Sequence, residues 1–167
     1  MKWKRIQFLE VNNMKIAILY YSKYGNTQTL AEFLVKKVQA EGHEGKLFNA
    51  KKSKPSELFA FQPDAILAGT PTHFGKPVRS FSKYIQKLGK DSTSSIQKAA
   101  VFNCYTGDNV CSIIQNQITE VLPHVEIFEG TLPIRTGGEN GELWKKVALQ
   151  KNWKDAASSF ISEFLNF

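Results

Sequence analysis

The sequence predicts an α/β fold in which a doubly wound, five-stranded parallel sheet carries helices on both faces. Three observations support this prediction. Short apolar runs have the length of strands, the segments between them space their apolar residues as helices do, and several strands end in glycine- and hydroxyl-rich turns. Strands buried on both faces that alternate with helices are typical of parallel sheets. The 167 residues suffice for one domain with a substantial core.

Strands and helices alternate along the chain. Residues 15–21 form a continuous apolar run, which predicts the first buried strand, and 27–39 follow with helical spacing and Gly42 as the stop signal. Further strands are expected at 45–49, 64–69, 98–104 and 125–134. Further helices are expected at 55–59, 77–88, 110–122 and 142–164, the last with a break near Gln150, and a loop is expected at 136–141.

The N-terminal residues stand apart from this alternation. The first clear strand begins near Met14, so residues 1–13 are interpreted as an N-terminal extension and 14–167 as a single domain. No apolar run approaches the roughly 18 residues of a membrane span. The first residues are basic but lack the apolar segment of a signal peptide. These features predict a cytoplasmic protein that does not insert into membranes.

The charge and the cysteines restrict the function further. The net charge is +7, with a pI near 9.4, yet no basic run is interleaved with aromatic residues, and 51–54 is the densest basic cluster. We therefore predict no nucleic-acid function; a solubilising surface, an acidic partner or an anionic substrate accounts for the charge. Cys104 and Cys111 are too few for a disulfide scaffold and match no exchange motif.

The first strand leads into a turn that is suited to a phosphate. Glycine allows close approach of the backbone, hydroxyl and amide side chains donate hydrogen bonds, and the following helix presents free N–H groups. The predicted phosphate residues are Ser22, Lys23, Tyr24, Gly25, Asn26 and Thr27. The turn lacks both the triphosphate-loop and the dinucleotide glycine patterns. The alternative is an ordinary strand-to-helix turn that Asn26 or Thr27 caps.

Two further turns follow the next strands along the sheet. The first combines a rigid proline, hydroxyl groups and flat rings, and its predicted binding residues are Thr70, Pro71, Thr72, His73, Phe74 and Gly75. The second contributes another ring and backbone N–H groups, through Asn103, Cys104, Tyr105, Thr106, Gly107 and Asp108. In the alternative interpretation Phe74 folds into the core, and Asp108 or Asn109 only caps a helix. A phosphate site beside a slot for a planar ring fits flavin mononucleotide (FMN) best.

The turn at 22–27, the segment GTPTHFG at 69–75 and the TGD at 106–108 together resemble the flavodoxin-like superfamily. The resemblance covers roughly residues 14–165. It implies the flavodoxin-like three-layer sandwich with non-covalent FMN, whose phosphate lies at the 22–27 turn and whose ring lies between the other two turns. No catalytic side chain and no metal is implied, because the flavin supplies the redox chemistry.

Two branches of this superfamily compete. The compact third turn resembles short-chain flavodoxins and predicts an electron-transfer protein that shuttles electrons through flavin semiquinone and hydroquinone states. The second turn also resembles tryptophan-repressor-binding-protein-type NAD(P)H:quinone oxidoreductases, which makes such an enzyme the alternative. Flavodoxins are acidic, whereas this chain is basic, so we expect redox partner proteins with acidic docking surfaces. A third possibility is an interaction domain that has lost the flavin.

Overall fold

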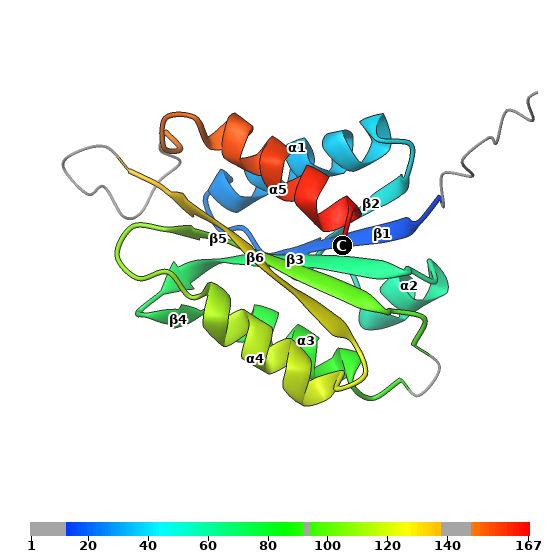
Figure 1. The fold of residues 1–167 in the computed structure, drawn as a ribbon. Helices are drawn as coiled ribbons and strands as arrows, with labels where there is room; N and C mark the ends of the chain where they lie inside the picture. The colour runs from blue at the N-terminus through cyan, green and yellow to red at the C-terminus, as the bar shows by residue number, and fades with distance from the viewer. Residues whose placement is uncertain (1–12, 92–93, 138–147) are drawn as a thin grey trace, which may run out of the picture.

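The computed structural model describes residues 13–91, 94–137 and 148–167. Five parallel strands form one sheet in the order β2-β1-β3-β5-β6. Figure 1 shows this sheet between two layers of helices. Their bounds are β1 Lys15–Tyr20, β2 Glu44–Asn49, β3 Ala65–His73, β5 Lys98–Tyr105 and β6 Glu126–Arg135. The strand order reverses between β1 and β3, which is the doubly wound arrangement that the sequence predicts.

Helices cover both faces of the sheet and divide the core into two layers. On one face lie α1 (Asn26–Ala40) and α5 (Trp153–Leu165); on the other lie α2 (Pro55–Ala60), α3 (Arg79–Leu88) and α4 (Cys111–Val121). Side chains of β1 alternate between the layers, because successive residues of a strand point to opposite faces. Ile16 and Ile18 join the α1/α5 layer, and Ala17 and Leu19 join the other layer.

Helix α1 has well-defined ends that fix its position behind β1. It begins after Gly25, which has a left-handed backbone (φ 96°). It ends at Ala40, and Gly42 (φ 89°) stops it: the Gly42 N–H donates to the Gln39 carbonyl, while the N–H of His43 donates to the Val38 carbonyl. This pair of bonds is a Schellman motif, so the predicted stop at Gly42 is confirmed. The helix therefore directs its N-terminus toward the carboxyl end of β1.

The segment after residue 69 differs from the prediction. Strand β3 continues to His73, turns at Phe74 and Gly75, and pairs with a short antiparallel strand, β4 (Lys76–Pro77). Helix α3 consequently begins at Arg79, two residues later than predicted. Both turn residues have positive φ, 50° at Phe74 and 72° at Gly75, as a two-residue hairpin turn requires. Phenylalanine is an unusual residue for such a turn, so the sequence does not indicate the hairpin.

The C-terminal prediction is wrong in part. Residues 148–152 are not helical, and α5 begins at Trp153. Instead, the N–H of Gln150 donates to the Arg135 carbonyl, and Leu149 forms a bridge with Thr136. Pairing with the end of β6 thus replaces helix in this stretch. The remaining expected helix at 142–147, most of the predicted 136–141 loop and the extension at 1–12 lie outside the described residues.

Gly69 of β3 has no side chain, and this leaves room for an aromatic ring of β5 between the sheet and α1. It pairs with Phe102, and a Cβ at Gly69 would lie 2.1 Å from the Phe102 ring. Phe102 is completely buried in the α1/α5 layer, so it has no room to retreat.

We predict that Gly69→Ala destabilises the domain by about 1–3 kcal/mol, because overpacking a filled core forces side chains and backbone to shift. Urea unfolding, monitored by circular dichroism, measures this change. Gly107→Ala is the matched control, since a Cβ at Gly107 meets no atom within 4 Å. Equal midpoints for the two variants would show that the ring does not hold this position.

Candidate functional site

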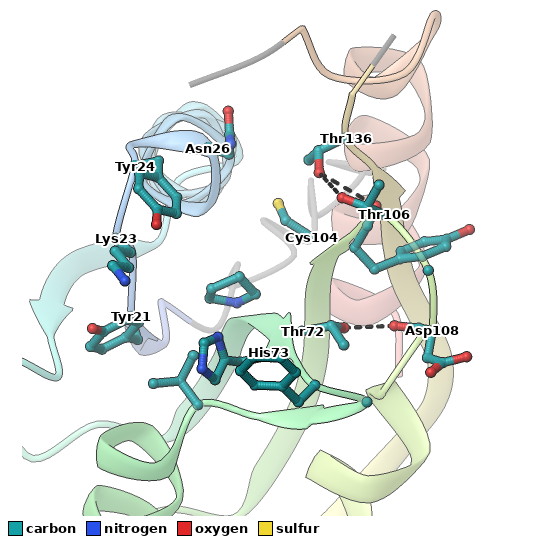
Figure 2. Close-up of a pocket in the computed structure, with 16 residues that line it drawn as sticks. Tyr21, Lys23, Tyr24, Asn26, Thr72, His73, Cys104, Thr106, Asp108 and Thr136 are labelled. Carbon is teal, nitrogen blue, oxygen red and sulfur yellow. Dashed lines mark hydrogen bonds between the residues drawn. The ribbon is translucent and has the colours of Figure 1, made fainter. Parts of the chain in front are cut away.

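A cavity of about 390 Å³ opens at the carboxyl end of the parallel strands, between the turns that follow β1, β3 and β5 (Figure 2). It lies where the strand order reverses, the usual place for a ligand in an open α/β sheet. Its walls come from Tyr21, Lys23, Tyr24, Asn26, Pro71, Thr72, His73, Phe74, Gly75, Val78, Cys104, Tyr105, Thr106, Gly107, Asp108 and Thr136. The three turns singled out in the sequence thus meet around one space.

The turn after β1 leaves the N-terminus of α1 open. Ser22 Oγ accepts the N–H of Gly25 at 3.1 Å, and Thr29 Oγ1 donates to the Gly25 carbonyl at 2.9 Å. Gly25 is the N-cap, and no side chain hydrogen-bonds to cap the first turn. Asn26 and Thr27 lie within the helix, so the alternative in which one of them caps an ordinary turn is wrong. The N–H groups that follow Asn26 in the first turn and the positive end of the helix dipole remain available to an anion.

Thr27 adds a second observation at the same helix end. Its side chain is buried, and its Oγ1 has no hydrogen-bond partner. The hydroxyl is close enough to the Cys104 thiol to act on its pKa, yet it does not reach hydrogen-bonding geometry. A buried hydroxyl without a partner costs free energy that a ligand oxygen would recover. The donor set therefore fits a phosphate.

A buried amide holds the other two turns together. Asn103 Nδ2 donates to the Thr70 carbonyl at 2.7 Å, and its Oδ1 accepts the N–H of Val110 at 3.1 Å. Thr72 Oγ1 donates to the Asp108 carbonyl at 2.6 Å (dashed in Figure 2). The ends of β3 and β5 and the start of α4 are thereby fixed relative to one another. Thr70 and Asn103 are fully buried in this network and do not line the cavity.

Phe74 stands at the tip of the β3–β4 hairpin, at the edge of the cavity. Its side chain is 82% exposed, so the alternative in which it folds into the core is wrong. Its ring meets that of His73 edge-on, with 4.5 Å between the centroids. Tyr105, the last residue of β5, also lines the cavity, and Tyr21 and Tyr24 lie on the side of β1. The cavity thus has aromatic side chains on several of its walls.

The end of β6 completes the wall beside α1. Thr136 Oγ1 lies 3.3 Å from Thr106 Oγ1, and the Arg135 guanidinium donates to the Thr106 carbonyl at 3.4 Å. Tyr21, Val78 and Thr136 line the cavity but were not predicted. Two of them could have been found, because Tyr21 directly follows β1 and Thr136 directly follows β6.

The predicted site residues divide into two groups. The larger group lines the cavity: Lys23, Tyr24, Asn26, Pro71, Thr72, His73, Phe74, Gly75, Cys104, Tyr105, Thr106, Gly107 and Asp108. Five lie behind it and support it: Ser22, Gly25, Thr27, Thr70 and Asn103. Among the five, only Thr27 leaves a buried polar atom without a partner.

Comparison with known proteins identifies the family, since a flavodoxin domain matches residues 17–132. The chain belongs to the flavodoxin domain family. Flavodoxin 2 from Bacillus cereus superposes with a TM-score of 0.71 at 22% identity, covering 91% of this chain and 98% of that protein. Rubredoxin oxygen:oxidoreductase from Desulfovibrio gigas gives 0.72 at 15% identity, covering 91% of this chain and 35% of that one. These likenesses confirm the flavodoxin-like fold.

Two curated relatives are similar in sequence over part of the chain. The minor allergen Alt a 7 of Alternaria alternata is 30% identical over 56% of this chain and 53% of its own length. An NAD(P)H dehydrogenase (quinone) of Gluconacetobacter diazotrophicus is 32% identical over 45% of this chain and 47% of its own. The chain thus spans about half the length of the curated relatives it matches.

The cysteines of this flavodoxin domain are free thiols in buried surroundings. Burial raises the pKa of Cys104, which lines the cavity, from 9.0 to about 12, and the nearby Thr27 hydroxyl offsets this only in part. Burial also raises the pKa of Cys111 to about 12. Both groups are therefore neutral thiols at physiological pH, and neither is activated as a nucleophile.

We predict that both thiols resist iodoacetamide at pH 8.5 in the native protein, with alkylation at least about a hundredfold slower than in urea, because the thiolate is the reactive form. Since the pKa values are raised on folding, the unfolded chain loses its thiol protons first. The free energy of unfolding should then fall as the pH rises from about 9 toward 12, and the decrease should be smaller in Cys104→Ala/Cys111→Ala. Native alkylation as fast as in urea would contradict the burial.

Proposed function

We propose that this chain is an FMN-binding electron-transfer protein. The observation that carries the proposal is the uncapped N-terminus of α1 with the partnerless Thr27 hydroxyl behind it, at one end of a cavity with aromatic walls. Membership of the flavodoxin domain family supports a flavin ligand. When bound, FMN supplies one- and two-electron redox chemistry, and the protein supplies the binding and the surroundings.

The turn after β1 would hold the phosphate. The Ser22 oxygen already accepts the Gly25 N–H, so its own hydroxyl proton is left to donate outward. The first-turn N–H groups of α1 and the Thr27 hydroxyl add further donors around a dianion. Lys23, which is exposed beside the cavity, adds a positive charge. This set of donors accounts for a phosphate without any metal ligand.

The turns after β3 and β5 would enclose the ring. His73 and Phe74 offer a face on one side and Tyr105 on another, so the ring would be shielded from water on its broad surfaces. Gly75 and Gly107 bring backbone groups without side chains to the cavity edge, where polar atoms of a heterocycle can be bound. Cys104 stays neutral and adds no charge near the ring. A site of this kind positions a redox group without an acid or base of its own.

We predict that Thr27→Val weakens FMN binding by about ten- to a hundredfold, because a hydrogen bond to a charged group is worth about 1.5–3 kcal/mol. Fluorescence titration of the apoprotein measures the dissociation constant. The stability of the apoprotein should be unchanged or higher, since the lost hydroxyl has no partner in the protein. Riboflavin, which lacks the phosphate, should bind wild type and variant alike. An equal loss for riboflavin would assign Thr27 to packing instead.

The second candidate function is that of an FMN-dependent NAD(P)H:quinone oxidoreductase. The 32% identity to an NAD(P)H dehydrogenase (quinone) favours it, although the match covers about half of either protein. Phe74 is exposed at the edge of the cavity, where a second substrate would have room. His73 and Tyr105 would then orient that substrate at the cavity mouth.

Anaerobic photoreduction of the FMN-loaded protein distinguishes the two functions. For the electron carrier we expect a long-lived flavin radical, detected by electron paramagnetic resonance, and slow oxidation of NAD(P)H whether or not quinone is present. Direct two-electron bleaching, together with rapid quinone-dependent NAD(P)H oxidation, would support the reductase and contradict the carrier. A protein that stays colourless after FMN is added would contradict both.

A further inference from the structure

We propose that the carboxyl edge of the sheet, around the mouth of the cavity, is a docking surface for an acidic redox protein. The inference rests on the proposed function, because it names the partner that would exchange electrons at this site. Its evidence is the distribution of charge over the two edges of the sheet, which is independent of the evidence for FMN.

Basic side chains gather at the carboxyl edge. The loops that follow the parallel strands, with the first residue of α3, carry what we call the basic rim: Lys23, Lys51, Lys52, Lys54, Lys76, Arg79, Arg135 and Lys151, all exposed. Within the described parts of these loops the acidic side chain is Asp108, and Glu57 and Asp155 follow in the first turns of α2 and α5. The rim therefore carries a large excess of positive charge around the cavity.

The opposite edge has a different balance. The segments that lead into the strands at the amino edge, in the described part of the chain, carry the acidic residues Glu41, Glu44, Asp64, Asp91 and Glu126 and the basic residues Lys15, Lys90 and Lys98. Within the described part of the chain, positive charge is thus concentrated at the carboxyl edge and not spread evenly as a solubilising coat would be. It lies where a redox group would be reached from outside, which steers an acidic molecule to that edge.

The width of the basic rim favours a macromolecule over a small anion. Lys51 and Lys52 follow β2 at one side of the sheet, and Arg135 ends β6 at the other. Neighbouring strands lie about 4.8 Å apart, so the five strands place these ends roughly 19 Å from each other. A single phosphate or carboxylate contacts only a few of these residues. The width instead suits one side of a protein interface, which covers about 800 Å².

Phe74 lies among the residues of the basic rim and offers an apolar contact there. It is 82% exposed at the tip of the β3–β4 hairpin, next to Lys76 and beside the cavity. An aromatic side chain surrounded by charged residues is the usual composition of an interface centre with its rim. Nucleic acid is the less favoured occupant, because electrons must leave through the cavity mouth and only a redox protein can receive them there.

The experiment measures binding of the full-length protein to cytochrome b5, an acidic haem protein, by isothermal titration calorimetry at low ionic strength. We expect a complex that weakens as salt is added and that is tighter than any complex with the basic cytochrome c. Lys51→Glu/Lys76→Glu, which alters the rim without touching the cavity lining, should weaken it about tenfold or more. Lys36→Glu/Lys90→Glu makes the same change of charge away from the rim and should change binding less than twofold.

The outcomes separate this inference from the proposed function. Docking is measured both with and without FMN. A failure to bind FMN would overturn the proposed function, but the effect of the charge substitutions on docking would still be measured. Equal or stronger binding of cytochrome c, or equal losses in the two double variants, would overturn the docking surface while FMN binding stands. Binding of a random-sequence DNA duplex through the rim, without binding of cytochrome b5, would overturn the choice of partner.

Discussion

The walls of the cavity depend on one buried amide, that of Asn103. It lies between the ends of β3 and β5, completely shielded from water, and its two polar atoms satisfy backbone groups of both the β3 end and the α4 start. Removal of the amide would leave those groups buried without partners, at a cost of about 1–3 kcal/mol for each. Thr72 extends the link to the Asp108 carbonyl. Two turns that are 31 or more residues apart in the chain thereby behave as one rigid frame.

The opposite wall of the cavity, at the N-terminus of α1, differs because it includes hydrogen-bonding groups that have no partner. An ordinary helix of this length would place a serine, threonine or aspartate at its N-cap, and doing so would stabilise it by about 1 kcal/mol. Helix α1 instead begins at a glycine, and the Thr27 hydroxyl within its first turn has no partner. Selection for stability alone does not explain why a glycine N-cap and a hydroxyl without a partner occur at the same helix end. A ligand that accepts hydrogen bonds at that position explains both.

The sequence predicts the sheet and most of the cavity because those features follow from local patterns. The apolar runs at β1 and β5 and the glycine after α1 each act within a few residues, so their positions are correct to one or two residues. The β3–β4 hairpin was missed because Phe74 occupies a backbone conformation that usually favours glycine or asparagine. The non-helical stretch at 148–152 was missed because pairing with Arg135 and Thr136 overrides its helical pattern, and no local signal reports such pairing.

The same reasoning explains why the site residues could be predicted only as a group. Every turn at the carboxyl edge contributes to the cavity, but which side chain faces inward depends on contacts across the sheet. Asn103 and Cys104 are neighbours in β5, and successive residues of a strand point to opposite faces. Asn103 therefore forms the hydrogen bonds that join the two turns, whereas Cys104 lines the cavity. Thr136 enters through the register of β6 beside β5, where Arg135 pairs with Tyr105.

The geometry of the third turn bears on the choice between carrier and enzyme. The segment between Tyr105 and α4 is short, and it is held at two points, by Thr72 at Asp108 in its middle and by Asn103 at Val110 before the helix. A wall fixed in this way favours a redox group whose surroundings do not rearrange when an electron is gained or lost. An enzyme that binds two substrates in turn instead needs a cavity wall that can move to admit each of them. The hairpin tip at Phe74 is 82% exposed and is therefore less enclosed by packing than this frame. A reductase would therefore have to work through the β3–β4 hairpin, whereas a carrier needs only the rigid frame and an accessible edge.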